Sequence, residues 1–216
     1  MQHSESLGNR PSVDTGTSFW SFWFIFIVSF VEGGALMAVE IVGAKMVGPY
    51  YGSSLYVWAA VLGLTLGGLT IGYFLGGLVS KRWPTRTALY TIILVSAVLV
   101  GMMPWSAPWI MEMTIGMDLR LGITISSLVF LFPPLVCFGM VSPLIIRLIT
   151  THKHKIGHAA GTVYAVSTTG GILMTYFVAF YTVHHIGMNE TLVATAALLA
   201  FFPVLFFSRI AKGLTG

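Results

Sequence analysis

Charged residues and cysteine are scarce in this chain of 216 residues. Only 8% of the residues are Asp, Glu, Lys or Arg, whereas a soluble domain carries about 25%. So few charged side chains cannot form the polar surface of a soluble domain, and that class is excluded. The one cysteine, Cys137, lies in an apolar run. It excludes an internal disulfide framework and a Cys-rich metal site, and we expect a small buried hydrophobic residue there.

Long hydrophobic runs are what the chain has instead. Hydrophobic residues make up 56% of it, and the mean hydropathy is +0.88. A helix needs about 20 apolar residues to cross a bilayer, and six runs meet or approach that length. We expect helices at about 19–47, 55–79, 88–108, 121–148, 159–183 and 191–207. The runs are too long for strands and lack the alternation of a membrane barrel.

The basic residues predict the orientation. The net charge of +4 would suggest a nucleic-acid partner in a soluble chain, but these residues lie in short loops, so we expect none. Arg120 falls on one side, and Lys45 at the outer end of the first helix. Nine others fall on the opposite side: Arg10, Lys81, Arg82, Arg86, Arg147, Lys153, Lys155, Arg209 and Lys212. The positive-inside rule then places both tails, 1–18 and 209–216, in the cytoplasm around a six-helix domain at 19–208.

Glycine is abundant, with 24 residues, and recurs at helical spacing. Such ridges of small residues let helix backbones approach closely in lipid. We expect packing within the chain, while a sliding or dimerising surface remains an alternative that spacing cannot separate. The second helix carries Gly63, Gly67, Gly68, Gly72 and Gly76, and the fifth carries Gly157 and Gly161, followed by Ala165 and Thr169.

Proline marks the fourth predicted helix. Pro133, Pro134 and Pro143 lie within it, and each removes a backbone hydrogen bond. We expect a kink or an unwound turn there. Broken helices line the substrate sites of many transporters, but kinks also occur in proteins that transport nothing.

Several segments, taken in order, carry a family resemblance. They are GGALMAVE at 33–40, YGSS at 51–54, the glycine-rich helix through Gly76 and Gly77, FGMVSPLIIR at 138–147 and GTVYAVSTTG at 161–170. Over about residues 30–200 the chain resembles the membrane domain of bacterial spermidine-synthase-like membrane proteins. Where that family has a Tyr-Glu pair, this chain has Val39 and Glu40.

The resemblance implies a bundle like half of a major-facilitator transporter, in a bacterial cytoplasmic (inner) membrane. The loop GLVSKRWPTR at 77–86 stands where such transporters carry an Asp-Arg motif, but Lys81 replaces the aspartate and Pro84 a glycine. Members of the family commonly continue into a soluble synthase domain. No strand followed by a Gly-x-Gly-x-x-Gly loop occurs in this sequence, so we expect that domain and its chemistry to be lacking here.

Three charged residues inside the first helix are the candidate substrate or ion site. Glu32 lies roughly 20 Å from Phe19 along the helix, and a carboxylate at such depth costs about 2.5–3.5 kcal/mol. It is either a proton or cation site or a protonated carboxyl group that hydrogen-bonds a neighbouring helix. Glu40 matches the family glutamate and suits a cationic amine. Lys45 either extends to the headgroups or pairs with Glu40.

The remaining polar residues suggest no catalytic or metal site. His154 and His158 stand four apart, which can place two imidazoles on one helix face, but no carboxylate or cysteine lies nearby to complete a metal site. The histidines lie at helix ends, away from any nucleophile of matching depth. We therefore expect no cofactor, no metal and no enzymatic activity.

Two functions remain open. The first is a non-catalytic scaffold or accessory subunit that binds a partner enzyme or a larger membrane complex, through membrane or cytoplasmic subunits. The second is a small homodimeric transporter of a polyamine or another cation that uses Glu32 and Glu40. Stoichiometry and the effect of replacing Glu32 separate the two.

Overall fold

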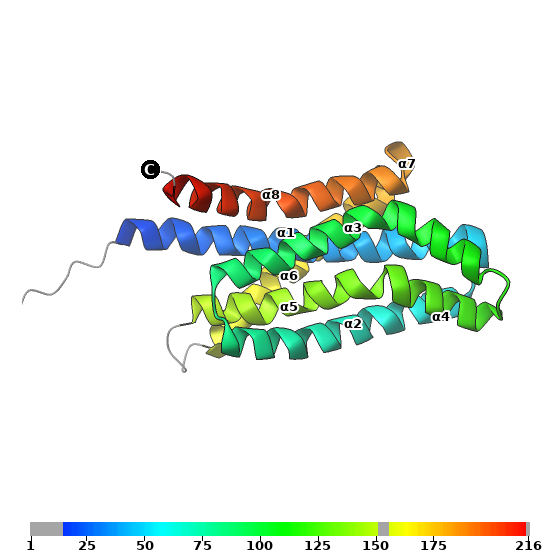
Figure 1. The fold of residues 1–216 in the computed structure, drawn as a ribbon, viewed down its shortest axis with the longest axis horizontal. Helices are drawn as coiled ribbons and strands as arrows, with labels where there is room; N and C mark the ends of the chain where they lie inside the picture. The colour runs from blue at the N-terminus through cyan, green and yellow to red at the C-terminus, as the bar shows by residue number, and fades with distance from the viewer. Residues whose placement is uncertain (1–14, 151–155, 215–216) are drawn as a thin grey trace, which may run out of the picture.

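The structure is a computed structural model that describes residues 15–150 and 156–214. Every regular element in these ranges is a helix (Figure 1). In chain order they are α1 (Thr15–Tyr51), α2 (Leu55–Arg82), α3 (Arg86–Thr114), α4 (Leu119–Phe130), α5 (Phe132–Ile149), α6 (Ile156–Phe177), the π-helix η2 (Val178–Thr182), α7 (Val183–His185) and α8 (Met188–Leu214).

Six helical segments in these ranges are long and apolar enough to cross a membrane. They are Trp23–Tyr51, Leu55–Arg82, Arg86–Thr114, Phe132–Ile149, Ile156–His185 and Met188–Ala211. The prediction of an all-α chain with six long apolar helices is confirmed. The tail at 1–14 and the loop at 151–155, with Arg10, His152, Lys153, His154 and Lys155, lie outside the described residues.

The fourth predicted segment, expected as one helix with a kink or an unwound turn, forms two helices. α4 ends at Phe130, and α5 begins at Phe132. Pro133 and Pro134 stand in the first turn of α5, where a missing backbone N–H costs little. In one continuous helix the same two prolines would remove two hydrogen bonds and clash with the preceding turn. Pro143, by contrast, lies within α5, which runs on to Ile149.

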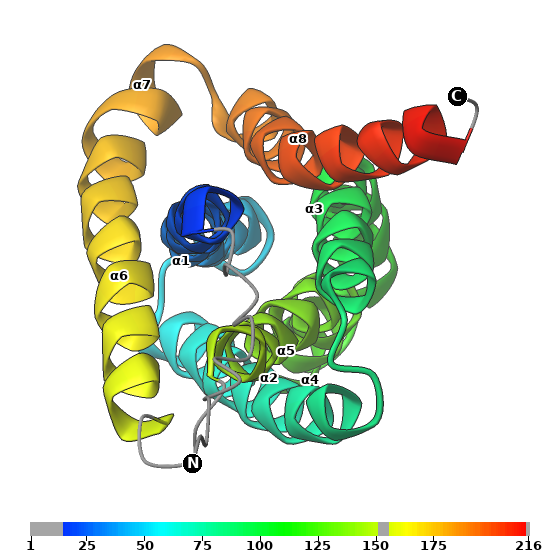
Figure 2. The same ribbon diagram turned by 90° about the vertical axis from the view of Figure 1, so that its left-hand side faces the viewer.

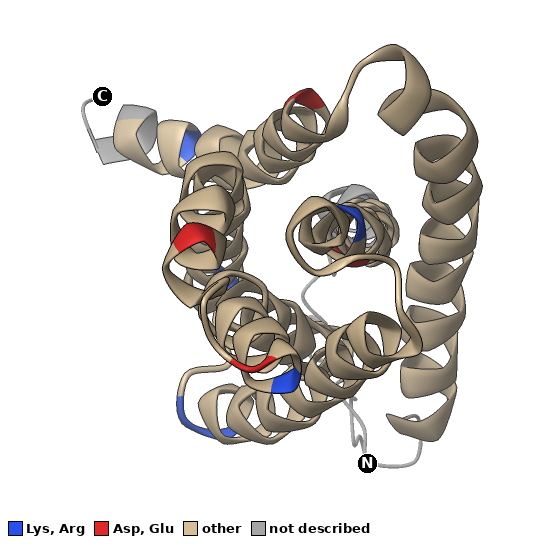
Figure 3. Cartoon of the chain, turned by 90° about the vertical axis from the view of Figure 1, so that its right-hand side faces the viewer, with Lys and Arg blue, Asp and Glu red and all other residues tan. Residues whose placement is uncertain are grey.

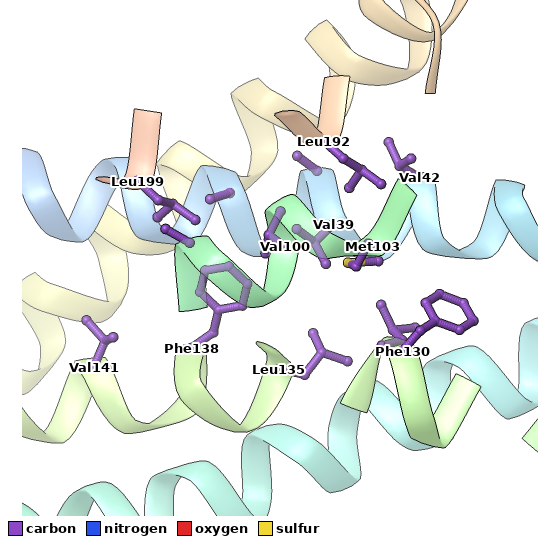
Figure 4. Packing of buried hydrophobic residues seen from close by; sticks show 14 of the residues in the cluster. Val39, Val42, Val100, Met103, Phe130, Leu135, Phe138, Val141, Leu192 and Leu199 are labelled. Carbon is purple, nitrogen blue, oxygen red and sulfur yellow. The ribbon is translucent and has the colours of Figure 1, made fainter. Parts of the chain in front are cut away.

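Helix α1 lies at the centre of the bundle, and the other membrane helices surround it (Figure 2). Its small residues Ala35 and Ala38 are completely buried, as are Val39 and Val42. Side chains from α3, α5 and α8 close on this surface (Figure 4): Val100, Met103, Leu135, Phe138, Leu192 and Leu199. α2 packs mainly on α5, α3 on α8, and α6 chiefly on α1.

Glycines bring the backbones of α2 and α5 into direct contact. A Cβ atom added at Gly72 would lie 2.7 Å from the Cα of Gly139, and one at Gly76 would lie 2.7 Å from the Cα of Met140. At Gly68 the nearest atom is the Cβ of Leu135, at 3.0 Å. These distances leave no room for a side chain.

The other glycines of the predicted ridges lie elsewhere. A Cβ at Gly67 would meet only the ring of Phe132, at 3.8 Å. At Gly63, Gly157 and Gly161 no described heavy atom lies within 4 Å of that position. These three glycines therefore make no close helix contact within the described chain.

The α1–α6 contact uses glycines outside the predicted ridges. A Cβ at Gly170 would collide with the backbone carbonyl of Phe30, and one at Gly33 with that of Ser167. Gly171 packs on Met37, and the added Cβ would lie 2.9 Å from its Cγ. α6 thus approaches α1 backbone to backbone along one narrow strip.

We predict that Gly72→Leu lowers the stability of the protein, by about 1–3 kcal/mol, because the new side chain must separate α2 from α5. Gly63→Leu is the matched control on the same helix, where the side chain meets open space. Thermal unfolding in detergent measures both variants. Equal melting temperatures for the two would contradict the packing described here.

Candidate functional site

Glu32 lies within the α1 membrane segment and is buried, with 3% of its surface exposed. The hydroxyl of Ser167, on α6, donates a hydrogen bond to its Oε2 at 3.3 Å. One turn earlier, the Ser29 hydroxyl donates to the Val163 carbonyl at 3.3 Å. Residues three and four apart share a helix face, so Ser29, Glu32 and Gly33 together form the α1 surface that meets α6.

A cavity of about 200 Å³ lies beside Glu32, between α1, α2, α5 and α6. One carboxyl group and six hydroxyl groups line it, together with apolar side chains. The polar residues are Glu32, Tyr73, Ser142, Tyr164, Ser167, Thr168 and Thr175, and the larger apolar ones are Leu36, Met37, Leu69, Phe138 and Ile172. A cavity of mixed lining with one buried acidic group is the usual form of a small-molecule site.

Two tyrosines line the cavity from facing helices. Tyr73 belongs to α2 and Tyr164 to α6, and their rings meet edge to face with centroids 6.4 Å apart and planes at 85°. The side chains are 40% and 43% exposed, so each ring keeps a free surface. The face of an aromatic ring carries partial negative charge, which adds to the anionic character of the cavity.

The structure does not bring the three predicted charged residues of α1 together. Glu40 lies two turns beyond Glu32, about 12 Å along the helix, and does not line the cavity. Its carboxyl group lies beside the side chain of Thr65 on α2. Lys45 is exposed and about 140° around the helix from Glu40. Among the described side chains no salt bridge joins these two residues.

A second cavity, of about 390 Å³, lies between α1, α6 and α8. Its lining is entirely apolar: Phe30, Val31, Gly34, Gly170, Leu173, Met174, Phe177 and Leu198. Without a polar group it offers no chemistry.

In the part of the chain that the structure describes, no group of three or more His, Cys, Asp or Glu could hold a metal ion. His154, one member of the spaced pair, lies outside the described residues, and His158 lies in the first turn of α6. Cys137 lies within α5 and is partly buried.

Tyr73, Tyr164 and Ser167 line the site but were not predicted from the sequence. A signal for part of the set does exist on α6, where Tyr164, Thr168, Gly171 and Thr175 recur every three or four positions. That polar stripe predicts a helix face turned away from lipid. No pattern in the sequence of α2 indicates that Tyr73 lies next to this stripe.

Comparison with protein-family models, with curated proteins and with solved structures finds no match to this chain. The resemblance to spermidine-synthase-like membrane proteins and to half of a major-facilitator transporter therefore stays a prediction.

We predict that water enters the Glu32 cavity. Two neighbouring threonines, each replaced by cysteine, provide the test. In a Cys137→Ser background, Thr168→Cys places a thiol in the cavity, while Thr169→Cys places one on the lipid-facing side of α6. A positively charged methanethiosulfonate should modify Thr168→Cys several-fold faster, because only a hydrated thiol ionises readily. Equal rates at the two positions would mean that no water reaches the cavity.

Proposed function

We propose that this protein is a non-catalytic membrane scaffold or accessory subunit, and that the uncovered face of α6 binds a transmembrane helix of a partner. The single observation that carries this proposal is the isolation of α6, which packs chiefly on α1 and leaves its opposite face bare. Figure 2 shows this helix beside the arc of the other helices. The rest of the membrane-facing surface of the protein contacts lipid.

The first half of the uncovered face carries small residues. Gly161, Ala165 and Thr169 are exposed and lie on successive turns of α6. Small side chains allow another helix to approach at backbone distance, where van der Waals contact drives association in lipid. Within the described chain no helix makes that approach to Gly161.

The second half carries stacked aromatic rings. Tyr176 and Phe180 stack with centroids 5.9 Å apart and planes at 10°. Phe177, which also borders the apolar cavity beside α1, stacks with Tyr181 at 5.5 Å and 20°. All four side chains are more than half exposed. Aromatic side chains offer large contact areas with few rotatable bonds, which suits them to interfaces. The π-helix η2 contains Phe180 and Tyr181, and such irregular turns frequently accompany functional surfaces.

The scaffold sits in the cytoplasmic (inner) membrane of a bacterium with both termini in the cytoplasm. Most of the ribbon carries no charged residue (Figure 3). Lys81, Arg82 and Arg86 lie where α2 gives way to α3, at the same end of the bundle as the C-terminus of α8 (Figure 1). Arg120 lies at the start of α4, at the other end. The excess of basic residues at the first end supports its cytoplasmic placement.

A second candidate function is a homodimeric transporter of a polyamine or another cation, with the chain as a half-transporter bundle. The Glu32 cavity favours it, because buried acidic groups in membrane helices commonly mark ion or substrate pathways. Glu40, about 80° around α1 from Glu32 and beside Thr65 of α2, would form a separate second position along such a path.

The scaffold proposal predicts that Ala165→Trp releases the partner, because the large side chain keeps a second helix from approaching α6. The measurement is affinity purification of the tagged chain from its native membrane in mild detergent, with the copurifying subunits quantified by mass spectrometry. Val98→Trp, at an exposed position of α3, is the matched control and should keep the full complex.

Other results would contradict the scaffold function or favour the transporter. A wild-type chain that purifies alone, or loss of the same subunit in both tryptophan variants, would contradict docking at α6. A homodimer without other subunits would favour the transporter, and uptake of radiolabelled amine by Glu32→Gln would then be compared with wild type.

The orientation is tested with reporter fusions in a bacterial host. We predict that alkaline phosphatase fused after Gly216 is inactive, because that enzyme folds only outside the cytoplasm, and that the same enzyme fused after Met117 is active. Green fluorescent protein should give the opposite pattern. Phosphatase activity at the C-terminal fusion would reverse the assigned topology.

A further inference from the structure

The Glu32 carboxyl group has little compensation from the protein. Its one hydrogen bond from a described residue comes from Ser167, at 3.3 Å. No Lys or Arg is among the described residues that line the cavity. A buried carboxylate without a cation beside it is costly. A positively charged ligand in the cavity would offset that cost.

The two tyrosines provide a second cation-attracting element. Tyr73 and Tyr164 line the same cavity as Glu32 and hold their rings nearly perpendicular to each other. Aromatic faces attract ammonium groups, and recognition of alkylated ammonium ions by clustered rings is a recurring use of this interaction. α2 and α6 have almost no other contact, so these rings form the wall of the cavity between the two helices.

Size and apolar lining decide between an inorganic and an organic cation. The cavity of about 200 Å³ far exceeds the roughly 10–15 Å³ that accommodates one water molecule. Leu36, Met37 and Ile172 supply apolar surface around the polar groups. A bare metal ion would leave this surface and volume unused, whereas the alkyl groups of an organic ammonium ion would fill both.

We propose that the cavity formed by Glu32, Tyr73 and Tyr164 is a binding site for a small organic ammonium ion. The Glu32 carboxylate pairs with the charge, Tyr73 and Tyr164 contact the alkylated nitrogen, and the apolar side chains hold its carbon atoms. This inference deepens the second candidate function by naming its ligand class. It requires neither transport nor the α6 partner, because binding is measured on the isolated protein.

The test is isothermal titration calorimetry on the purified full-length chain in lipid nanodiscs. The probes are tetramethylammonium and butylammonium chloride, with sodium chloride as the inorganic cation and neopentyl alcohol as an uncharged molecule of similar shape. We expect saturable binding of at least one ammonium ion at one site per chain. Neither sodium nor the alcohol should compete at matched concentration.

The variants separate charge from ring contact. Glu32→Gln keeps the shape of the side chain and should weaken ammonium binding by about tenfold or more, since a desolvated charge pair is lost. Glu40→Gln removes a carboxyl group of the same helix outside the cavity and should leave affinity within about twofold. Tyr73→Leu should weaken binding by about three- to tenfold, as loss of a cation–π contact predicts. Tyr73→Phe retains the ring and should bind like wild type.

Three results would overturn the proposal. They are the absence of saturable binding of both ammonium ions by the wild type, unchanged affinity in Glu32→Gln, and equally strong competition by sodium. If Glu32→Gln does not purify as a single species, the Phe and Leu variants at position 73 decide the matter. Equal affinity in those two would exclude the ring contact. Ala165→Trp should still bind the ammonium ion. Partner binding and ammonium binding can therefore fail independently, and each proposal is tested separately.

Discussion

Direct backbone contact at glycine is the constraint on which this bundle depends. In lipid, apolar side chains gain little by leaving one hydrocarbon environment for another, so close van der Waals packing must hold the helices together. Gly72 and Gly139 supply that contact between α2 and α5, and Gly33 and Gly170 supply it between α1 and α6. A single added methyl group at any of these four positions would push two helices apart.

The same contacts create the polar site. Because α6 approaches α1 at Gly33 and Gly170, Ser167 comes within hydrogen-bonding distance of Glu32. α2 is drawn to α5 rather than to α6, so a space remains between α2 and α6, and the rings of Tyr73 and Tyr164 border it. A buried carboxyl group and an adjoining cavity are thus consequences of where the glycines lie. The fold keeps an acidic group away from lipid by placing it at an interface where two helix backbones are in contact.

The two proposed roles use different sides of α6. Its inner side meets α1 and contributes Tyr164 and Ser167 to the cavity, while its outer side presents Ala165 and Thr169 outward. A partner helix that binds the outer side of α6 would contact a helix that also lines the cavity. Partner binding and ligand binding could then influence each other through the position of α6, which has few other contacts to hold it.

The sequence by itself determined the six apolar helices, because hydrophobic length is a local property. It also predicted the interruption near Pro133 and Pro134, where missing N–H groups act within one turn. The partners of each helix were decided only by tertiary structure. Gly63 and Gly72 share one helix and one residue type, yet only Gly72 meets α5. Glu32 could be recognised as unusual from its depth, but Tyr73 and Ser167 join it through contacts more than forty and more than a hundred positions apart in the chain. Spacing along a helix reports which residues share a face, whereas the packing of all helices together decides what that face meets.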